Sequence, residues 1–251
     1  EACAGGCMKP AEFQESDVRQ FFQSLQRGND EAVVELRALG FEGRDNNTFS
    51  GYFNQEEQFV QAARLAAQKS SGAYCTINVC NPQLLSRRAN RAVPFAKLTT
   101  SDGDILRRQY LPIDLDPERP AGTSSSDEQH EAAIERSRDV FRFLQQQNFG
   151  SPIIIDSGNG AHLLLPFDYP NDEKSKNLAF NVLKSLAKHF NDAQIKVDES
   201  VFNAARIMRL PGTMNRKGDD LPKYPHRSCR ILHIPDSLKA CLSLPKSVEA
   251  A

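Results

Sequence analysis

Two aspartates, Asp114 and Asp116, are the residues whose type and spacing most directly suggest chemistry. They lie in the segment Leu111-Pro-Ile-Asp-Leu-Asp-Pro117, whose apolar residues are typical of a strand. Side chains two residues apart on a strand point to the same face, so the two carboxylates are expected side by side. Like charges this close repel each other, which makes a divalent cation their natural occupant. The alternative is an Asp-Pro turn at a solvated strand end.

A glycine-containing turn, Asp156-Ser-Gly-Asn-Gly-Ala-His162, separates two apolar runs. Glycines allow backbone amides to approach phosphate oxygens closely, and a serine hydroxyl and a histidine ring add further donors. The pattern therefore predicts a triphosphate site. A plain Asn-Gly hairpin is the alternative, but it leaves His162 unexplained. The residues of the predicted site are Ser157, Gly158, Asn159, Gly160 and His162.

A third group begins at Asp198, which follows a short predicted strand at 195–197. Asp198 is a candidate third carboxylate beside Asp114 and Asp116, because three carboxylates can hold two hard cations. Capping of a following helix is the other interpretation of an acid at such a junction. Arg206 and Arg209 follow, and their spacing predicts that they face one way on a helical turn.

Basic residues gather locally although the formal net charge is only −1. Affinity for phosphate depends on such local patches, so two segments are candidates for nucleic-acid contact. One contains Arg87, Arg88 and Arg91, for which a solvated face is an equal alternative. The other runs from 206 to 230 and includes Arg209 and Lys217, the stronger candidates for phosphate contacts. Arg206 and Arg227 in the same segment fit either a phosphate contact or a structural ion pair.

The elements that position these residues divide the chain into two modules, an N-terminal α/β module at 1–100 and a second module at 101–251. From residue 104 the pattern is strand, helix, strand, strand, helix, strand, with both helices expected on one face of a sheet. The other face is left for a nucleotide and a nucleic-acid strand. Helices are predicted at 17–26, 55–69, 127–147 and 173–190. Strands are predicted at 32–39, 48–53, 73–79, 106–115, 152–156, 161–167, 195–197 and 230–234.

Composition indicates a globular chain, with 251 residues of which 39% are hydrophobic and 25% charged. No apolar run is long enough to span a bilayer and no secretory segment is recognisable, so we expect a cytoplasmic protein without membrane contact. A start at Glu1 suggests a piece of a longer protein. The six cysteines are expected as reduced thiols. Zinc binding by Cys3 and Cys7, or by Cys75 and Cys80, is a weaker alternative because neither pair has the usual spacer.

Taken in order, these motifs resemble those of the archaeo-eukaryotic primase (AEP) superfamily, especially its bacterial, plasmid and phage primase-polymerases. The resemblance rests on Ile113-Asp-Leu-Asp116, Ser157-Gly-Asn-Gly-Ala-His162, Val197-Asp198 and Arg206-Ile-Met-Arg-Leu-Pro-Gly-Thr213. It extends to Tyr74-Cys-Thr-Ile-Asn78 before the first motif, to Asp116-Pro-Glu-Arg-Pro-Ala-Gly122 around it, and to Arg216-Lys-Gly218 and Pro225-His-Arg227 after the last. The resemblance thus covers about residues 50–235.

The resemblance implies an α/β (α+β) fold, with an RRM-like catalytic module packed against a smaller N-terminal α/β module. It implies a DNA primase-polymerase that joins NTPs or dNTPs to a primer strand on a single-stranded DNA template. Asp114, Asp116 and Asp198 are then ligands of two Mg²⁺ or Mn²⁺ ions. Residues expected at nucleotide phosphates are Ser157, Gly158, Asn159, Gly160, His162, Arg209 and Lys217. Further expected phosphate or template contacts are Arg206, Arg227, Arg88 and Arg91.

The chain departs from the family pattern by lacking a strong zinc motif and a helical or helicase region after about residue 240. We therefore expect a catalytic core from a longer protein, with a helicase or another replication or defence domain as partner, that extends primers better than it starts them. The alternatives are a non-catalytic single-strand-binding module and a metal-dependent nuclease. Few aromatic residues outside helix faces disfavour the first, and a triphosphate cradle disfavours the second.

Overall fold

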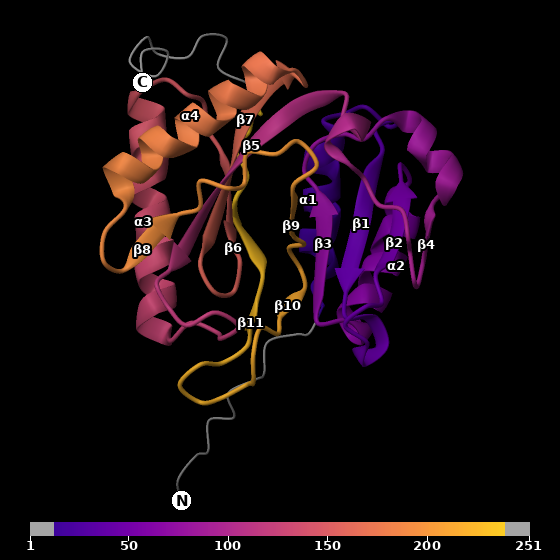
Figure 1. The fold of residues 1–251 in the computed structure, drawn as a ribbon, viewed down its shortest axis with the longest axis horizontal. Coiled ribbons are helices and arrows are strands. Elements are labelled where there is room, and N and C mark those ends of the chain that lie inside the picture. Colours follow the sequence, from indigo (N-terminus) through magenta and orange to yellow (C-terminus); the bar gives the residue numbers. More distant parts are fainter. Residues whose placement is uncertain (1–12, 239–251) are drawn as a thin grey trace, which may run out of the picture.

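Two five-stranded sheets lie side by side in the computed structural model, which describes residues 13–238 (Figure 1). Every strand pair within them is antiparallel. The helices are α1 (Glu15–Gln26), α2 (Glu56–Lys69), α3 (Asp127–Gln146) and α4 (Glu173–Phe190), with 3₁₀ turns at Phe41–Gly43, Pro82–Arg87 and Asp102–Asp104. The strands are β1 (Val34–Leu39), β2 (Phe49–Phe53), β3 (Gly72–Thr76), β4 (Arg91–Val93), β5 (Arg107–Pro117), β6 (Ile153–Asp156), β7 (Ala161–Pro170), β8 (Ile195–Val197), β9 (Ile207–Arg209), β10 (Met214–Asn215), β11 (Arg227–Ser228) and β12 (Arg230–His233).

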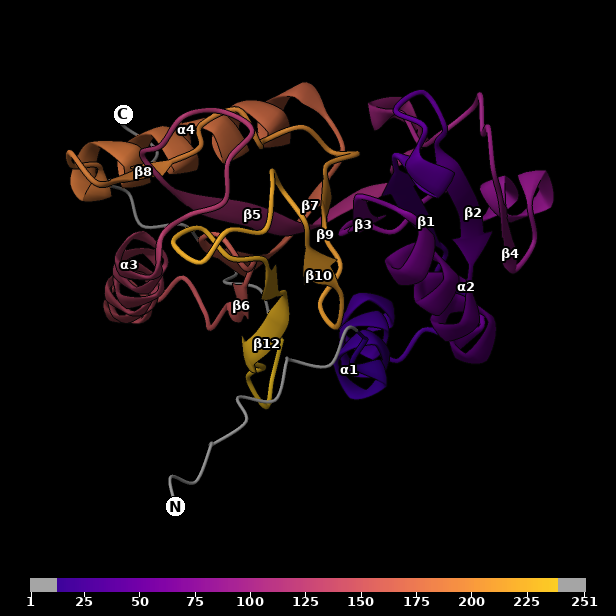
Figure 2. The ribbon, with the colours of Figure 1, turned by 90° about the horizontal axis from the view of Figure 1, so that it is seen from below.

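The first sheet has the strand order β4-β2-β1-β3-β9 and carries α1 and α2. Its last strand comes from late in the chain, because β9 pairs with β3. Figure 2 shows α1 at the junction of the two halves, where it contacts both α2 and β12. Apolar side chains of α1 and α2 form one continuous core with β6 and β7 of the other sheet. The second predicted module thus contributes one strand, β9, to the sheet of the first, and the two modules share a core.

The second sheet has the order β12-β6-β7-β5-β8. Without β12, it is built from the predicted strand-helix-strand-strand-helix-strand unit, with the first and third strands (β5 and β7) at its centre, which is the RRM-like arrangement. Ser126 begins α3 with a capping box to Gln129, and Asp172 caps α4 by accepting from the Ser175 amide at 2.8 Å. The α+β fold predicted from the sequence is confirmed.

The helices α3 and α4 pack on one face of this sheet, as predicted, against Leu111, Ile113 and Leu115 of β5. Alternation along β5 sends the intervening side chains to the other face. There Tyr110 joins the core shared with the first sheet. Asp114, further along the same face, lines an open pocket instead. The pocket therefore opens where the first sheet no longer covers β5.

The predicted helical turn around Arg206 and Arg209 is wrong. Residues 207–209 form β9, in which Arg209 pairs with Tyr74 and Ile207 with Thr76. A strand this short carries little pattern of its own, and its conformation follows from pairing with the free edge of β3. The short strands β4, β10 and β11 were not predicted either.

Cys75, Cys80 and Cys229 are buried free thiols. Burial raises the pKa of Cys80 to about 11 and that of Cys75 further still, so both are neutral. They behave as small hydrophobic residues. Cys3, Cys7 and Cys241 lie outside the described residues. None of the helices at residues 13–238 has the length and apolarity needed to cross a bilayer.

A buried carboxylate, Glu35, ties the first sheet to the segment that leads into β5. Arg37 donates to it at 2.6 Å, the Ser50 hydroxyl at 2.6 Å and the Thr100 amide at 2.9 Å. Burial raises the pKa of Glu35, but these donors, led by Arg37, outweigh it and hold the pKa below its ordinary value. Glu35 is therefore ionised and stabilising at neutral pH.

We expect Glu35→Ala to lower the free energy of unfolding by about 3–5 kcal/mol, because it strands a partly buried Arg37. Since the folded-state pKa is depressed, the stabilisation is present above the ordinary pKa of 4.5 and is lost as pH falls through the folded value. Urea unfolding followed by circular dichroism between pH 3 and 7 measures both effects. Lys69→Ala, which breaks an exposed pair with Glu42, is the control and should cost under about 1 kcal/mol. Equal losses in the two variants would contradict this account.

Candidate active site

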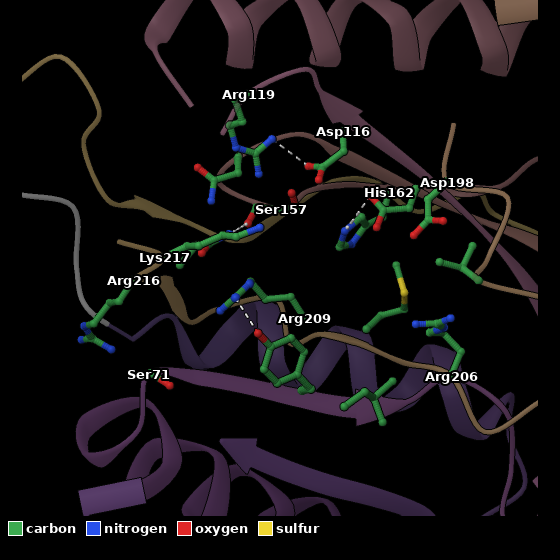
Figure 3. Close-up of a pocket in the computed structure, with 17 residues that line it drawn as sticks. Ser71, Asp116, Arg119, Ser157, His162, Asp198, Arg206, Arg209, Arg216 and Lys217 are labelled. Atoms are coloured by element: carbon green, nitrogen blue, oxygen red, sulfur yellow. Dashed lines mark hydrogen bonds and ion pairs between the residues drawn. The ribbon is translucent and has the colours of Figure 1, made fainter. Parts of the chain in front are cut away.

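The pairing of β5 with β7 sets Asp114 directly opposite His162. His162 Nε2 lies 3.4 Å from Asp114 Oδ1, and both side chains line a pocket of about 340 Å³. Asp116, two residues further along β5, lines the same pocket. In Figure 3, Asp116, His162 and Asp198 lie on one side, with Arg209 and Arg206 across from them. The structure thus brings the first two motifs together.

Asp198 reaches the pocket from the end of β8. Its backbone amide donates to the Asp114 carbonyl at 2.9 Å, which continues the β5–β8 ladder by one residue. Its carboxylate accepts from the Ser200 amide at 2.8 Å in an Asx turn, and no α-helix follows in the described chain. The helix-cap alternative is therefore wrong, and three carboxylates line one pocket.

Asp114 carries the electrostatic strain of this arrangement, although 25% of its side chain is exposed to the pocket. Burial, then Asp116 and Asp198, raises its pKa to about 8, against a smaller opposing effect of Arg206 and Arg119. The ordinary value is 3.8. A cation in the pocket would relieve this repulsion.

His162 is neutral in this setting. Burial, which outweighs the nearby carboxylates, lowers its pKa to about 4. Its Nδ1 is buried and has no hydrogen-bond partner within the described structure. A neutral imidazole offers one donor and one acceptor, so His162 can bind a ligand without adding charge.

Arg119 is a pocket residue whose role the sequence did not suggest. Its guanidinium is anchored by the carbonyls of Thr123 and Pro117, at 3.1 and 2.9 Å, and its side chain is 6% exposed. The same guanidinium lies 3.1 Å from Asp116 Oδ1. It offsets part of the negative charge and orients this carboxylate.

Arg209 lies across the pocket from the carboxylates and is 8% exposed. It donates to the Tyr74 hydroxyl at 2.7 Å and its guanidinium carbon lies 4.8 Å from the centre of the Tyr74 ring. A Cβ at Gly72 would meet the Tyr74 ring at 2.8 Å, so only glycine leaves room for this stack. The Nη1 of Arg209 is buried without a partner in the described structure. Such a donor is suited to an anionic ligand.

Arg206 and Lys217 also line the pocket. Arg206 donates to the Ser200 carbonyl at 2.8 Å, and its Nε is buried with no hydrogen-bond partner among the residues described. Lys217 is exposed, and no ion pair of its ammonium group occurs in the described part of the chain. Arg216 lies beside it and donates to the Ala67 carbonyl at 2.8 Å. Arg206, Arg209 and Lys217 therefore line the same cavity as the three carboxylates.

The predicted triphosphate turn contributes side chains more than backbone amides. The Gly158 amide donates to Asp156 at 2.8 Å and the Gly160 amide to the Ser157 hydroxyl at 3.0 Å. Both amides are thus engaged within the turn, which corrects their expected role as phosphate donors. Close packing explains the glycines, because a Cβ at Gly158 would meet the Arg227 carbonyl at 2.7 Å and one at Gly160 the Leu115 carbonyl at 2.2 Å. Ser157 and Asn159 do line the pocket.

Three of the predicted cations lie elsewhere. Arg227 does not line the pocket, and its guanidinium donates to Asp127 at 2.6 Å, which supports the structural ion pair over the phosphate contact. Arg91 is on β4, at the edge of the first sheet opposite β9. Arg88 precedes it and donates to the Leu98 carbonyl at 3.2 Å. A template contact by Arg88 or Arg91 stays a prediction, away from the pocket.

The pocket fits divalent cations by donor type and by charge. Carboxylate oxygens are the ligands that Mg²⁺ and Mn²⁺ prefer. Burial and then the carboxylates of Asp116 and Asp198 raise the pKa of Asp114, and a cation would oppose the repulsion among the three carboxylates. Among residues 13–238, no group of three or more His, Cys, Asp or Glu side chains is arranged so that it could hold a metal ion by itself. Asp114, Asp116 and Asp198 line the pocket together and are the candidate protein ligands, and ligand and water oxygens would have to complete the shell.

Comparisons with known proteins find the fold but no close sequence relative. No protein-family model matches the chain, and no curated protein sequence matches it. The AEP domain of the cyanophage S-2L primase-polymerase is 13% identical, with a TM-score of 0.53 over 96% of this chain and 98% of that chain. This chain therefore has the fold of an AEP-type primase-polymerase core, as the order of its motifs predicted.

Two further solved structures are similar at lower scores. The primase RepB′ is 11% identical, with a TM-score of 0.48 over 92% of this chain and 61% of that chain. The polymerase domain of Mycobacterium tuberculosis ligase D, solved in complex with DNA, is 15% identical, with a TM-score of 0.43 over 86% of this chain and 81% of that chain.

We expect Tyr74→Phe to weaken binding of inorganic triphosphate roughly fivefold, because Arg209 loses the hydroxyl that orients it while the ring stack remains. Isothermal titration calorimetry at constant ionic strength measures the affinity. Tyr224→Phe removes a hydroxyl from the loop between β10 and β11 and serves as the control. Unchanged affinity in Tyr74→Phe would show that Arg209 does not bind the anion.

Proposed function

We propose that this chain is a template-dependent nucleotidyltransferase, a DNA primase-polymerase that synthesises or extends primers on single-stranded DNA. The main support is that buried polar side-chain atoms without a hydrogen-bond partner gather in the pocket. Of the six such side-chain atoms among the described residues, five belong to pocket residues. They are Asn159 Nδ2, His162 Nδ1, Arg206 Nε, Arg209 Nη1 and Asn215 Oδ1. Unpaired buried polar atoms cost about 1–3 kcal/mol each, so their concentration in the pocket that three carboxylates line is typical of a ligand site.

The pocket has a wall of carboxylates that suits divalent cations and, across from it, basic side chains that suit a triphosphate. Asp114, Asp116 and Asp198 would hold two divalent ions, which when bound lower the pKa of the attacking 3′-hydroxyl and stabilise the leaving pyrophosphate. Arg209 and Lys217, across the pocket, would hold the triphosphate. These cations neutralise its charge and keep its α-phosphorus near the carboxylate wall, which lowers the entropic part of the barrier.

The remaining polar groups would orient the nucleotide without adding charge. Ser157 and Asn159 offer neutral donors, and the neutral His162 offers a donor and an acceptor between them and Asp114. Arg119 would steady Asp116 through its anchored guanidinium, so that the carboxylate does not have to reorganise during the reaction.

The same walls argue against the two alternatives. A passive single-strand-binding groove needs basic and aromatic side chains along a backbone, whereas this pocket adds three carboxylates that such a groove does not require. A nuclease also uses clustered carboxylates, but its reaction involves no triphosphate. The buried donor of Arg209 and the ammonium of Lys217 are accounted for by a nucleoside triphosphate.

We expect the chain to extend a primer on single-stranded DNA with Mn²⁺ or Mg²⁺, and Asp114→Asn to lower kcat at least roughly 10³-fold. Labelled primed and unprimed templates, each with NTPs and with dNTPs, separate extension from initiation on a sequencing gel. Asp139→Asn, an exposed aspartate of α3, is the matched control and should retain full activity. Shortening of the labelled strand would indicate a nuclease. Strand binding without synthesis, unaffected by a chelator, would indicate the binding module.

We expect Mn²⁺ to raise the melting temperature of the wild-type chain and to have little effect on Asp114→Asn, since stabilisation at 100 times the dissociation constant is about 2.7 kcal/mol. Because the folded-state pKa of Asp114 is raised to about 8 from 3.8, its carboxyl costs stability as pH rises through that range. Asp114→Asn should therefore melt higher than wild type in metal-free buffer at pH 8.5. Differential scanning calorimetry with and without a chelator tests both statements. A metal-free variant that melts lower would contradict the repulsion.

A further inference from the structure

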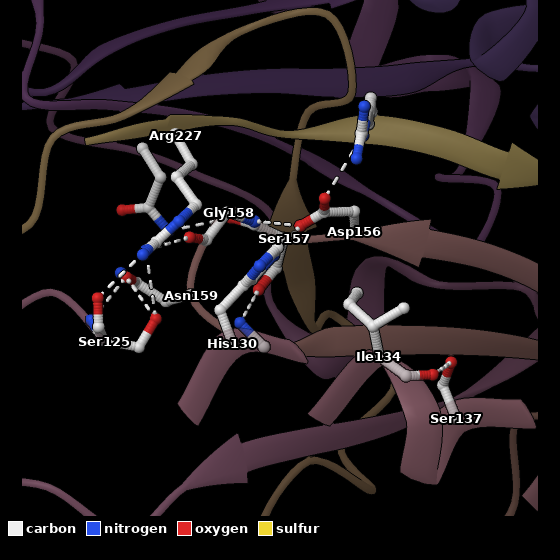
Figure 4. A network of polar contacts seen from close by, with 12 residues as sticks. Ser125, His130, Ile134, Ser137, Asp156, Ser157, Gly158, Asn159 and Arg227 are labelled. Carbon is white, nitrogen blue, oxygen red and sulfur yellow. Dashed lines mark hydrogen bonds and ion pairs between the residues drawn. The ribbon is translucent and has the colours of Figure 1, made fainter. Parts of the chain in front are cut away.

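The turn between β6 and β7 is held from behind by a polar network that the reaction itself does not use (Figure 4). This turn, residues 156–160, presents Ser157 and Asn159 to the pocket. The network joins it to the start of α3 and to the strands β11 and β12. The residues that hold the turn do not line the pocket, so they can affect a ligand only through the turn.

Arg227 of β11 is the centre of one arm. Its Nη1 donates to the Ser125 carbonyl at 3.0 Å and the Gly158 carbonyl at 3.3 Å, and its Nη2 donates to Asp127 at 2.6 Å. The side chain is only 15% exposed. One planar guanidinium therefore spans three chain segments, the loop before α3, the first turn of α3 and the β6–β7 turn.

Ser125 passes this constraint on to Asn159. Arg227 donates to the Ser125 hydroxyl at 3.3 Å, and the Ser125 amide and hydroxyl reach Asn159 Oδ1 at 2.9 and 3.2 Å. A backbone amide can only donate, so the oxygen of the Asn159 side chain must face Ser125. The Asn159 Nδ2 is thereby turned away from Ser125, and it is buried with no partner in the described structure. The hydrogen bonds from Ser125 to Asn159 Oδ1 therefore set the direction in which Asn159 Nδ2 points.

Asp156 forms the second arm, at the start of the same turn. His130 of α3 lies 2.7 Å from its Oδ1, the Gly158 amide donates to Oδ1 at 2.8 Å, and Arg230 of β12 donates to Oδ2 at 3.2 Å. Burial raises the pKa of Asp156, but these partners, led by His130, outweigh it and hold the pKa below its ordinary value. The ionised carboxylate fixes the near end of the turn, which leaves the Arg227 arm to fix the far end.

We propose that Arg227 is a positioning residue, which through Ser125 aims the Asn159 amide at the phosphates of the incoming nucleotide. The proposal rests on the function proposed above. Arg227 occupies its guanidinium on carbonyls and on Asp127 within the protein, so it acts on the nucleotide without touching it. A lysine in its place carries the same charge but cannot span the three segments, because its ammonium is a single point.

The test is steady-state primer extension by the full chain with varied nucleotide concentration. We expect Arg227→Lys to raise KM for the nucleotide roughly five- to tenfold with kcat within about twofold, since Asn159 binds substrate and transition state alike. Asp127→Asn weakens only the contact of Arg227 with the exposed Asp127 and leaves its bonds to Ser125 and Gly158, so it should raise KM by about twofold. A merely structural loss would lower the active fraction, and with it kcat, while KM stayed constant.

Arg136→Lys is the matched control. Arg136 of α3 also forms an ion pair, with Asp192 at 2.5 Å, and it donates to the Phe190 carbonyl as well. Its side chain is 23% exposed. It does not line the pocket, so KM and kcat should both stay at wild-type values. An equal rise of KM in this control would overturn the specific role of Arg227.

A double-mutant cycle with Asn159→Ala tests the path of the effect. If Arg227 acts through Asn159, the double variant has the KM of Asn159→Ala alone, whereas independent effects multiply. Multiplied effects, or an unchanged KM in Arg227→Lys, would overturn the inference while leaving the polymerase activity intact. A wild-type chain that neither extends a primer nor binds nucleotide would instead overturn the proposed function, and the inference with it.

Discussion

Repulsion among three carboxylates is the constraint on which the rest of the pocket depends. Asp114, Asp116 and Asp198 are kept close by backbone pairing, which does not weaken when the side chains repel each other. Arg119 offsets the charge of Asp116, and the neighbouring His162 stays neutral, so neither removes the negative potential at Asp114. The sheet thus stabilises a cluster that its own side chains would not form. A cation bound in this pocket would offset the negative charge that the fold leaves unbalanced.

The spacing of apolar residues predicted the long strand β5 and the helices α3 and α4, whose conformations are visible in the local sequence. Alternation marked β5, with Asp114 and Asp116 on one face, and amphipathic spacing marked α3 and α4. Arg209 shows the limit. Its strand is three residues long and exists because β3, far earlier in the chain, offers a free edge. Periodicity in a short segment cannot reveal a partner strand, so a helical turn was the wrong prediction there.

The unpredicted residues differ in how visible they were. Arg119 follows Asp116 at a spacing of three, just after the end of β5, and a basic residue so close in the chain was a local signal for the pair observed. Tyr74 belonged to a segment of the family resemblance, but nothing near it in the chain indicated its role, because it acts through a bond to a residue 135 positions away. Charge alone left two interpretations open for Arg227, a phosphate contact and a structural ion pair, because a basic residue binds a carbonyl or a carboxylate as readily as a phosphate. Side-chain identity fixes what a residue can do, and topology decides whether it does it.

The pocket shows why a binding site and a stable core make opposite demands. In the core of the first sheet, Glu35 has three donors to balance its burial. In the pocket, Arg209 and Asn159 keep buried donors without partners in the described structure. Each unpaired donor lowers the stability of the ligand-free protein. A ligand that accepts a hydrogen bond from this donor removes the cost, and its binding is stronger by that amount. Partners within the protein for these donors would stabilise the chain and weaken ligand binding. Five of the six unpaired buried side-chain atoms of the described residues therefore belong to the pocket, where a ligand would sit.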